Sequence, residues 1–80
     1  MHMVHVRLFA AARAAAKTDR IELASGRVSE ILSQCSQMHP DLARIIPQCS
    51  FLVDGVANHD RDVIVAPGSQ LDILPKFAGG

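Results

Sequence analysis

The hydrophobic pattern changes its period several times along the chain. Residues 4–8 read Val-His-Val-Arg-Leu, and this alternation of apolar and polar side chains predicts a strand with one buried face. Residues 10–17 are rich in alanine, the best helix former, and predict a short helix of about two turns. A second short strand is expected at residues 21–23, before the turn signal Ser25-Gly26.

The longest helical pattern covers residues 28–38. Its apolar side chains recur every three or four residues: Val28, Ile31, Leu32, Cys35 and Met38. Pro40 stops this pattern, because the residue before a proline is disfavoured in the α region. Pro40 is itself suited to open a short helix through Ile45, which Pro47 would close. The sequence therefore predicts one principal helix with an apolar face suited to cover a sheet.

The second half of the chain has the pattern of strands. Residues 51–53 are apolar and run into Asp54-Gly55, a strong hairpin signal. Residues 58–62 are polar and predict a loop or an edge, and Pro67-Gly68 predicts a further turn. The remaining strands are expected at residues 56–57, 63–65 and 71–74.

This order of elements predicts an α+β fold in which one principal helix packs on one mixed sheet. Two strands before the helix and two or three after it fit a β-grasp, ubiquitin-like arrangement, with the first and last strands parallel at the sheet centre. A doubly wound fold needs more strand–helix units than the chain has. We therefore expect a β-grasp domain over residues 1–74 and a flexible tail over residues 75–80.

Composition narrows the function classes. The chain has 80 residues, 49% of them hydrophobic, which indicates a single domain. Eight Lys and Arg balance eight Asp and Glu, so there is no basic excess to indicate a nucleic-acid partner. No apolar run is long enough to cross a membrane, and no signal peptide is recognisable. We expect a cytoplasmic protein with no nucleic-acid or membrane partner.

Neither cysteine gives a strong chemical signal. Cys35 and His39 are spaced as two metal ligands on one helix face could be, but no second pair accompanies them. Cys35 also continues the apolar face of the principal helix, so a buried side chain is the favoured interpretation. Cys49 has no basic neighbour in sequence to activate it as a nucleophile. We predict no metal site.

The carboxyl end is the most distinctive segment. Six residues follow the last predicted strand, and the last two are Gly79 and Gly80. Glycine has no Cβ, so such an end can pass through a channel too narrow for side chains. Fully extended, six residues reach about 20 Å.

These motifs together resemble the MoaD/ThiS family of sulfur carriers, and most closely its molybdopterin synthase branch. The resemblance rests on four segments: Val-Arg-Leu-Phe-Ala-Ala-Ala-Arg at residues 6–13, Val53-Asp54-Gly55, Leu-Asp-Ile-Leu-Pro at residues 71–75, and Ala78-Gly79-Gly80. Where the family usually has a second proline after Pro75, this chain has Lys76.

The resemblance implies a carrier that is not an enzyme by itself. A ubiquitin-activating-like adenylyltransferase would use ATP to adenylate Gly80, and a persulfide donor would then convert Gly80 to a thiocarboxylate. Ala78 and Gly79 would thread into the large subunit of molybdopterin synthase, in an assembly of two small and two large subunits. The thiocarboxylate would donate its sulfur to the pterin precursor of the molybdenum cofactor. No cofactor would be bound to the chain itself.

Strand alternation suggests where partners dock. If Val4, Val6 and Leu8 face the helix, their neighbours point to the other face of the sheet, and likewise Leu71 and Ile73 point inward while Asp72 and Leu74 point outward. We expect an exposed apolar patch beside the tail, with basic flanks: Arg7, Phe9, Leu74, Pro75, Lys76 and Phe77. The alternative is that Phe9 and Leu74 are core residues of a sheet covered on both faces.

Two other functions stay open. A related carrier could serve another pathway, or a ubiquitin-like modifier could be conjugated through Gly80. A β-grasp binding module whose glycine tail has no role is the third possibility.

Overall fold

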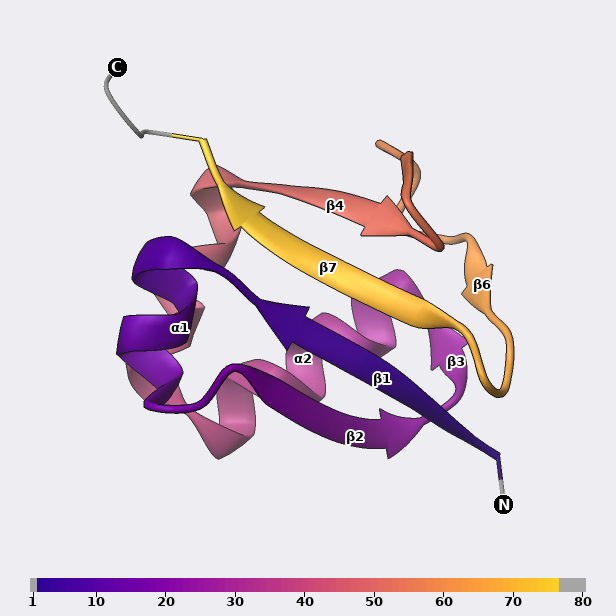
Figure 1. Cartoon of the computed structure of the whole chain (residues 1–80), viewed down its shortest axis with the longest axis horizontal. Helices are drawn as coiled ribbons and strands as arrows, with labels where there is room; N and C mark the ends of the chain where they lie inside the picture. Colours follow the sequence, from indigo (N-terminus) through magenta and orange to yellow (C-terminus); the bar gives the residue numbers. More distant parts are fainter. Residues whose placement is uncertain (1, 77–80) are drawn as a thin grey trace.

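The computed structural model describes residues 2–76 of the chain. In it the principal helix crosses one face of a mixed sheet (Figure 1). The elements in chain order are β1 (Met3–Leu8), α1 (Ala10–Ala16), β2 (Arg20–Ala24), β3 (Gly26–Arg27), α2 (Val28–Met38), α3 (Pro40–Ala43), the 3-10 helix η1 (Ile46–Gln48), β4 (Cys49–Val53), β5 (Val56–Ala57), β6 (Ile64–Val65) and β7 (Gln70–Pro75).

The main sheet has five strands in the order β2-β1-β7-β4-β5. β1 and β7 lie side by side and parallel, with Val6 opposite Leu71 and Leu8 opposite Ile73, whereas the other neighbours are antiparallel. This is the β-grasp, ubiquitin-like fold, and the predicted parallel pair at the centre of the sheet is confirmed. Because β1 and β7 are parallel, their carboxyl ends lie at the same edge of the sheet.

One face of this sheet forms the core. Val4, Val6, Leu71 and Ile73 alternate along the two central strands and have no exposed surface. They pack with the apolar face of α2, whose buried members are Val28, Ile31, Leu32 and Cys35. At α2's start, the Glu30 carboxylate accepts a hydrogen bond from the Arg27 backbone N–H at 2.8 Å, which satisfies a donor at the helix end.

The hairpin between β4 and β5 confirms the Asp54-Gly55 signal. Asp54 has φ 50° and Gly55 has φ 84°, the pair of positive values that a type I′ turn requires. Val53 and Val56 flank the turn as a cross-strand pair. Glycine and aspartate tolerate this conformation better than most residues.

The structure also corrects several boundaries. The short helix opened by Pro40 ends at Ala43 instead of Ile45, and Pro47 lies within η1. The predicted strand at residues 63–65 pairs with β3, which the sequence did not indicate, in a separate two-stranded ladder. Two residues per strand are too few to show a periodic pattern.

β7 is longer than predicted and includes Pro75. Ladder pairing continues to this point, because Cys49 lies opposite Pro75 and the Lys76 N–H donates to the Gln48 carbonyl at 3.0 Å. β1 ends at Leu8, opposite Ile73, so Pro75 lies beyond β1 and its missing N–H removes no bond to that strand. Within residues 2–76, no helix is both long enough and apolar enough to cross a membrane.

Candidate functional site

The candidate site lies where β1 and β7 end, on the sheet face opposite α2. The Phe9 N–H donates to the Ile73 carbonyl at 3.2 Å, which fixes Phe9 beside the end of β7. Phe9 and Leu74 are both half-buried. The expected exposed patch is therefore less exposed than alternation suggested, because neighbouring side chains cover part of each residue.

Arg7 is one of the side chains that provide this cover. Its guanidinium carbon lies 5.2 Å from the centroid of the Phe9 ring, within the range of a cation–π contact. The structure thus brings Arg7 and Phe9 together, as the predicted docking patch requires.

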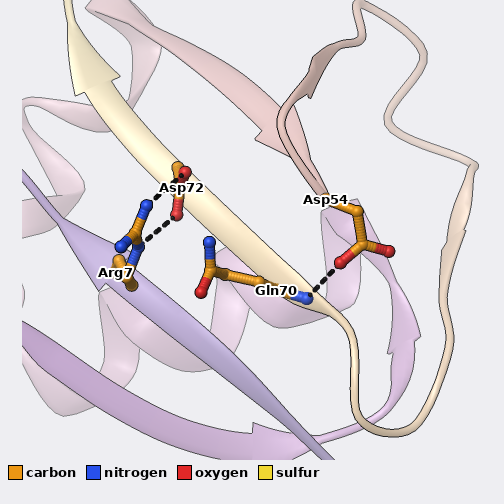
Figure 2. A network of polar contacts seen from close by, with 4 residues as sticks. All are labelled: Arg7, Asp54, Gln70 and Asp72. Carbon is orange, nitrogen blue, oxygen red and sulfur yellow. Dashed lines mark hydrogen bonds and ion pairs between the residues drawn. The ribbon is translucent and has the colours of Figure 1, made fainter.

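The same guanidinium forms a paired contact with Asp72 across the two central strands (Figure 2). Arg7 Nε and Nη2 donate to the two carboxylate oxygens at 2.9 and 3.1 Å. Hydrogen bonding to Asp72 and the attraction of its charge outweigh desolvation and raise the pKa of Arg7 above its usual value. Such two-pronged pairs combine charge with fixed geometry.

Asp72 itself was expected to point outward. It does lie on the outer face, but it is only 4% exposed, because Arg7 covers it from the neighbouring strand. Figure 2 shows Gln70 next to this pair on β7, and the Gln70 backbone N–H donates to an Asp54 carboxylate oxygen at 2.9 Å. These contacts tie the outer face of β7 to β1 and to the β4–β5 turn.

The rest of the predicted docking set is only partly described. Pro75 is half-buried at the end of β7, and Lys76 is exposed. Phe77, Ala78, Gly79 and Gly80 lie outside the described residues, so the positions predicted to thread and to carry sulfur remain predictions.

A pocket of about 160 Å³ lies next to Lys76, and sequence reasoning missed it. Its lining residues are Pro47, Cys49, Ser50, Phe51, Asn58, His59, Arg61 and Lys76. The Arg61 guanidinium carbon stands 5.0 Å from the centroid of the Phe51 ring, so Phe51 supports this cation. The basic residues of the 58–62 loop were a signal, but only the fold places them next to Lys76.

Neither thiol is activated. Cys35 has no exposed surface, and burial raises its pKa to about 11, which confirms the predicted buried role. The Cys49 thiol donates to the Ile45 carbonyl, with Sγ and O 3.3 Å apart. Burial raises the Cys49 pKa, and the charge of Arg61 offsets part of this rise. Residues 2–76 contain no group of three or more His, Cys, Asp or Glu side chains that could hold a metal ion.

Comparison with known proteins assigns the chain to a family. The model of the ThiS family matches residues 6–80. The chain belongs to the ThiS family. No curated protein matches the sequence. The family assignment makes this chain a ThiS/MoaD-type sulfur carrier or a related small modifier.

Solved structures of other proteins share the fold at low identity. The small archaeal modifier protein 1 from Methanosarcina acetivorans matches with a TM-score of 0.87 and 22% identity, covering 100% of this chain and 99% of that one. A putative molybdopterin converting factor subunit 1 from Pyrococcus furiosus matches with a TM-score of 0.83 and 19% identity, covering 94% and 98%. In Helicobacter pylori, a complex of subunits 1 and 2 of molybdopterin-converting factor contains a chain matching with a TM-score of 0.73 and 19% identity, covering 98% and 99%. At these identities the likeness shows the fold alone.

Proposed function

We propose that this ThiS-family chain is the sulfur-carrying small subunit of a molybdopterin synthase. The observation that carries the proposal is the position of β7, which lies at the centre of the sheet and leads to Gly79 and Gly80, four and five residues after Pro75. A β-grasp body held by a central strand can present the end of that same strand to a partner. The reacting group is then the main-chain carboxylate of Gly80, and the chain needs no catalytic side chain.

The chemistry of a carboxylate explains why an activating partner is required. A free α-carboxylate has a pKa of about 3.5, so at neutral pH it is ionised and resists nucleophiles. Attack of the Gly80 carboxylate on the α-phosphate of ATP releases pyrophosphate and forms an acyl-adenylate. The terminal sulfur of a persulfide then attacks the carbonyl carbon and AMP leaves. A thiol that cleaves the resulting S–S bond leaves the thiocarboxylate on Gly80.

The outer face beside Phe9 supplies the docking surface in this proposal. Phe9 and Leu74 offer half-buried apolar area, and Arg7 is held over the Phe9 ring by its contact with Asp72. Aromatic and Arg side chains are enriched where protein interfaces gain most of their energy. The partners we propose are the large synthase subunit, in a two-plus-two assembly, and a ubiquitin-activating-like adenylyltransferase. The Helicobacter pylori complex, with its two named subunits, supports a partner of the first kind.

A small protein modifier is the second candidate. The Methanosarcina acetivorans modifier resembles this chain in fold at least as closely as the molybdopterin-converting subunits do. Both functions share the acyl-adenylate. In a modifier, the amine of a lysine on another protein attacks the carbonyl carbon instead of sulfur, AMP leaves, and an isopeptide bond forms.

The test reconstitutes the two stages separately. First, the chain is incubated with ATP, an adenylyltransferase and a persulfide donor, and its intact mass is measured. We expect the mass to rise by the difference between one sulfur and one oxygen atom, and a chain lacking Gly80 to show no gain while keeping its fold. Second, the charged protein is mixed with the large subunit and the pterin precursor. Formation of the dithiolene product supports the molybdopterin assignment, whereas sulfur loading without product contradicts it.

A further inference from the structure

The edge of β4 nearest Lys76 has no strand beside it in the described part of the chain. β5 pairs only with Leu52 and Val53, at the far end of β4. In an antiparallel ladder, successive residues direct their N–H and C=O groups alternately to the two sides of a strand. The Lys76 N–H donates to the Gln48 carbonyl, so the backbone N–H and C=O groups of Gln48 and Ser50 point toward β7. The backbone groups of Cys49 and Phe51 therefore point to the open side of β4.

Two of the four backbone groups on this side already have partners. The Cys49 N–H donates to the Ile46 carbonyl, and the Phe51 carbonyl accepts from the Asn58 N–H at 3.1 Å. The Cys49 carbonyl and the Phe51 N–H remain on the open side. In a parallel pair of strands, one residue donates its N–H to a carbonyl of the neighbouring strand and accepts from the N–H two residues further along that strand. The Cys49 carbonyl and the Phe51 N–H are spaced to bond one residue of an added parallel strand in this way.

The side chains around this edge select for negative charge. Arg61, His59 and Lys76 line the pocket beside it, and no carboxylate does. Asp60 and Asp62 flank Arg61 in the chain, but neither lines the pocket, and the Asp60 carboxylate accepts the Asp62 N–H at 2.9 Å within the loop. The loop is also anchored, because the Arg61 carbonyl accepts from the Ser29 N–H at 2.9 Å. The Arg61 guanidinium is therefore attached to a fixed backbone next to the open edge.

We propose that the Cys49–Phe51 edge binds an extended acidic segment of a partner protein. The segment adds one parallel residue to β4 and places a carboxylate against Arg61 and Lys76. The position favours a partner that acts on the carboxyl terminus, because Lys76 is the residue next to the last four of the chain. The inference deepens the proposed function by naming the chemistry of a partner segment, and in this respect it rests on that function.

The test titrates 15N-labelled full-length protein with two short peptides, acetyl-Glu-Val-Glu-Val-Glu-amide and the same peptide with Gln in place of Glu. With the acidic peptide we expect saturable shifts of the Phe51 amide and of the amides of the 58–62 loop. The neutral peptide should bind at least about fivefold more weakly, because it lacks the charge that the pocket selects.

Charge-reversal variants locate the contact. Arg61→Glu and Lys76→Glu should each weaken the acidic peptide about tenfold. Lys17→Glu, at the exposed end of α1, makes the same change in net charge away from the edge and should bind like the unmodified chain. Amide dispersion checks that each variant is folded, and Lys76, being exposed, gives a variant that does not depend on the Arg61–Phe51 contact.

Three results of the peptide titrations would overturn the inference: shifts confined to another face, equal binding of the two peptides, or equal binding by the charge-reversal variants and the Lys17 control. Inorganic phosphate at matched ionic strength is the remaining probe. If it reproduces the full set of shifts and displaces the peptide, the pocket is a simple anion site and peptide docking is wrong. None of these measurements uses sulfur chemistry, so the inference and the proposed function fail independently.

Discussion

The two faces of the central strands are built on opposite principles. Toward α2, Val6 and Ile73 are fully buried members of the hydrophobic core. On the other face of the same strands, Arg7 and Asp72 form a charged pair, and Asp72 is almost as buried as the core. One face is shielded by a helix, whereas the other is shielded mainly by its own long side chains.

In the function proposed above, this difference separates the stability of the domain from the recognition of a partner. Apolar burial supplies the free energy of folding without directional demands, so the helix-covered face holds the domain together. The outer face carries half-buried apolar residues held among fixed polar contacts, which suits a surface that a partner completes. Adjacent residues of β7 can thus be changed separately to test each face.

The largest effect should come from the inner face. Ile73→Ala removes a fully buried side chain and should lower the free energy of unfolding by about 2–5 kcal/mol. Leu74→Ala, one residue later and half-buried on the other face, is the matched control and should cost clearly less. Urea denaturation measures both. Equal losses would show that the two faces do not differ as described.

The next largest effect should be a loss of stability at alkaline pH, caused by a buried thiol in the core. The pKa of the Cys35 thiol is about 11 in the folded chain against a reference of 9.0, so the unfolded chain loses this proton first. The free energy of unfolding should therefore decline as pH rises from about 9 to about 11, by about 2–3 kcal/mol in all. Cys35→Ala should lack this decline, and Cys49→Ala should retain most of it. Urea titrations across that pH range decide the point, and parallel curves for Cys35→Ala and the unmodified chain would contradict it.

The charged pair of the outer face should give a smaller effect. Asp72→Asn takes away the charge that Arg7 binds and should destabilise the domain less than Ile73→Ala does. Glu22→Gln is the control, because the exposed His5–Glu22 contact, 3.4 Å long, should contribute at most about 0.5 kcal/mol. Thermal unfolding at low and high salt distinguishes the variants. If Asp72→Asn lowers the stability no more than Glu22→Gln does, burial of the Arg7–Asp72 pair contributes nothing to the stability of the domain.

The smallest change concerns the junction after β1. Ala10 has φ 52°, a left-handed value that is costly for a residue with a Cβ. Ala10→Gly relieves this strain but loses more backbone entropy on folding, so we expect a gain of at most about 1 kcal/mol in the free energy of unfolding. Calorimetry tests the sign, and a loss of stability would show that Ala10 is not strained.

Local patterns were enough to predict the main elements. α2 follows from its apolar spacing, and the β4–β5 hairpin follows from Asp54-Gly55, since each signal lies within a few residues of sequence. The burial of Asp72 could not be predicted in this way. Alternation gives the face on which a side chain lies, but the cover depends on Arg7 reaching across from a strand at the other end of the chain.

The pocket shows the same limit. Arg61 and Lys76 come together because Cys49 pairs with Pro75 while the 58–62 loop returns to the start of α2. No pattern in the sequence predicts that these two residues lie close together. Gly79-Gly80, by contrast, could be recognised from the sequence alone. In the proposed function, the main-chain carboxylate of Gly80 carries the sulfur.

That role is tested most directly on protein purified from its native cells. Trypsin cleavage after Lys76 releases residues 77–80, and the mass of this peptide reports the state of the Gly80 carboxyl group. We predict a population in which sulfur replaces one oxygen atom at Gly80. If Gly80 is found only as the unmodified carboxylate, or only joined to a lysine of another protein, the chain is not the sulfur carrier proposed here.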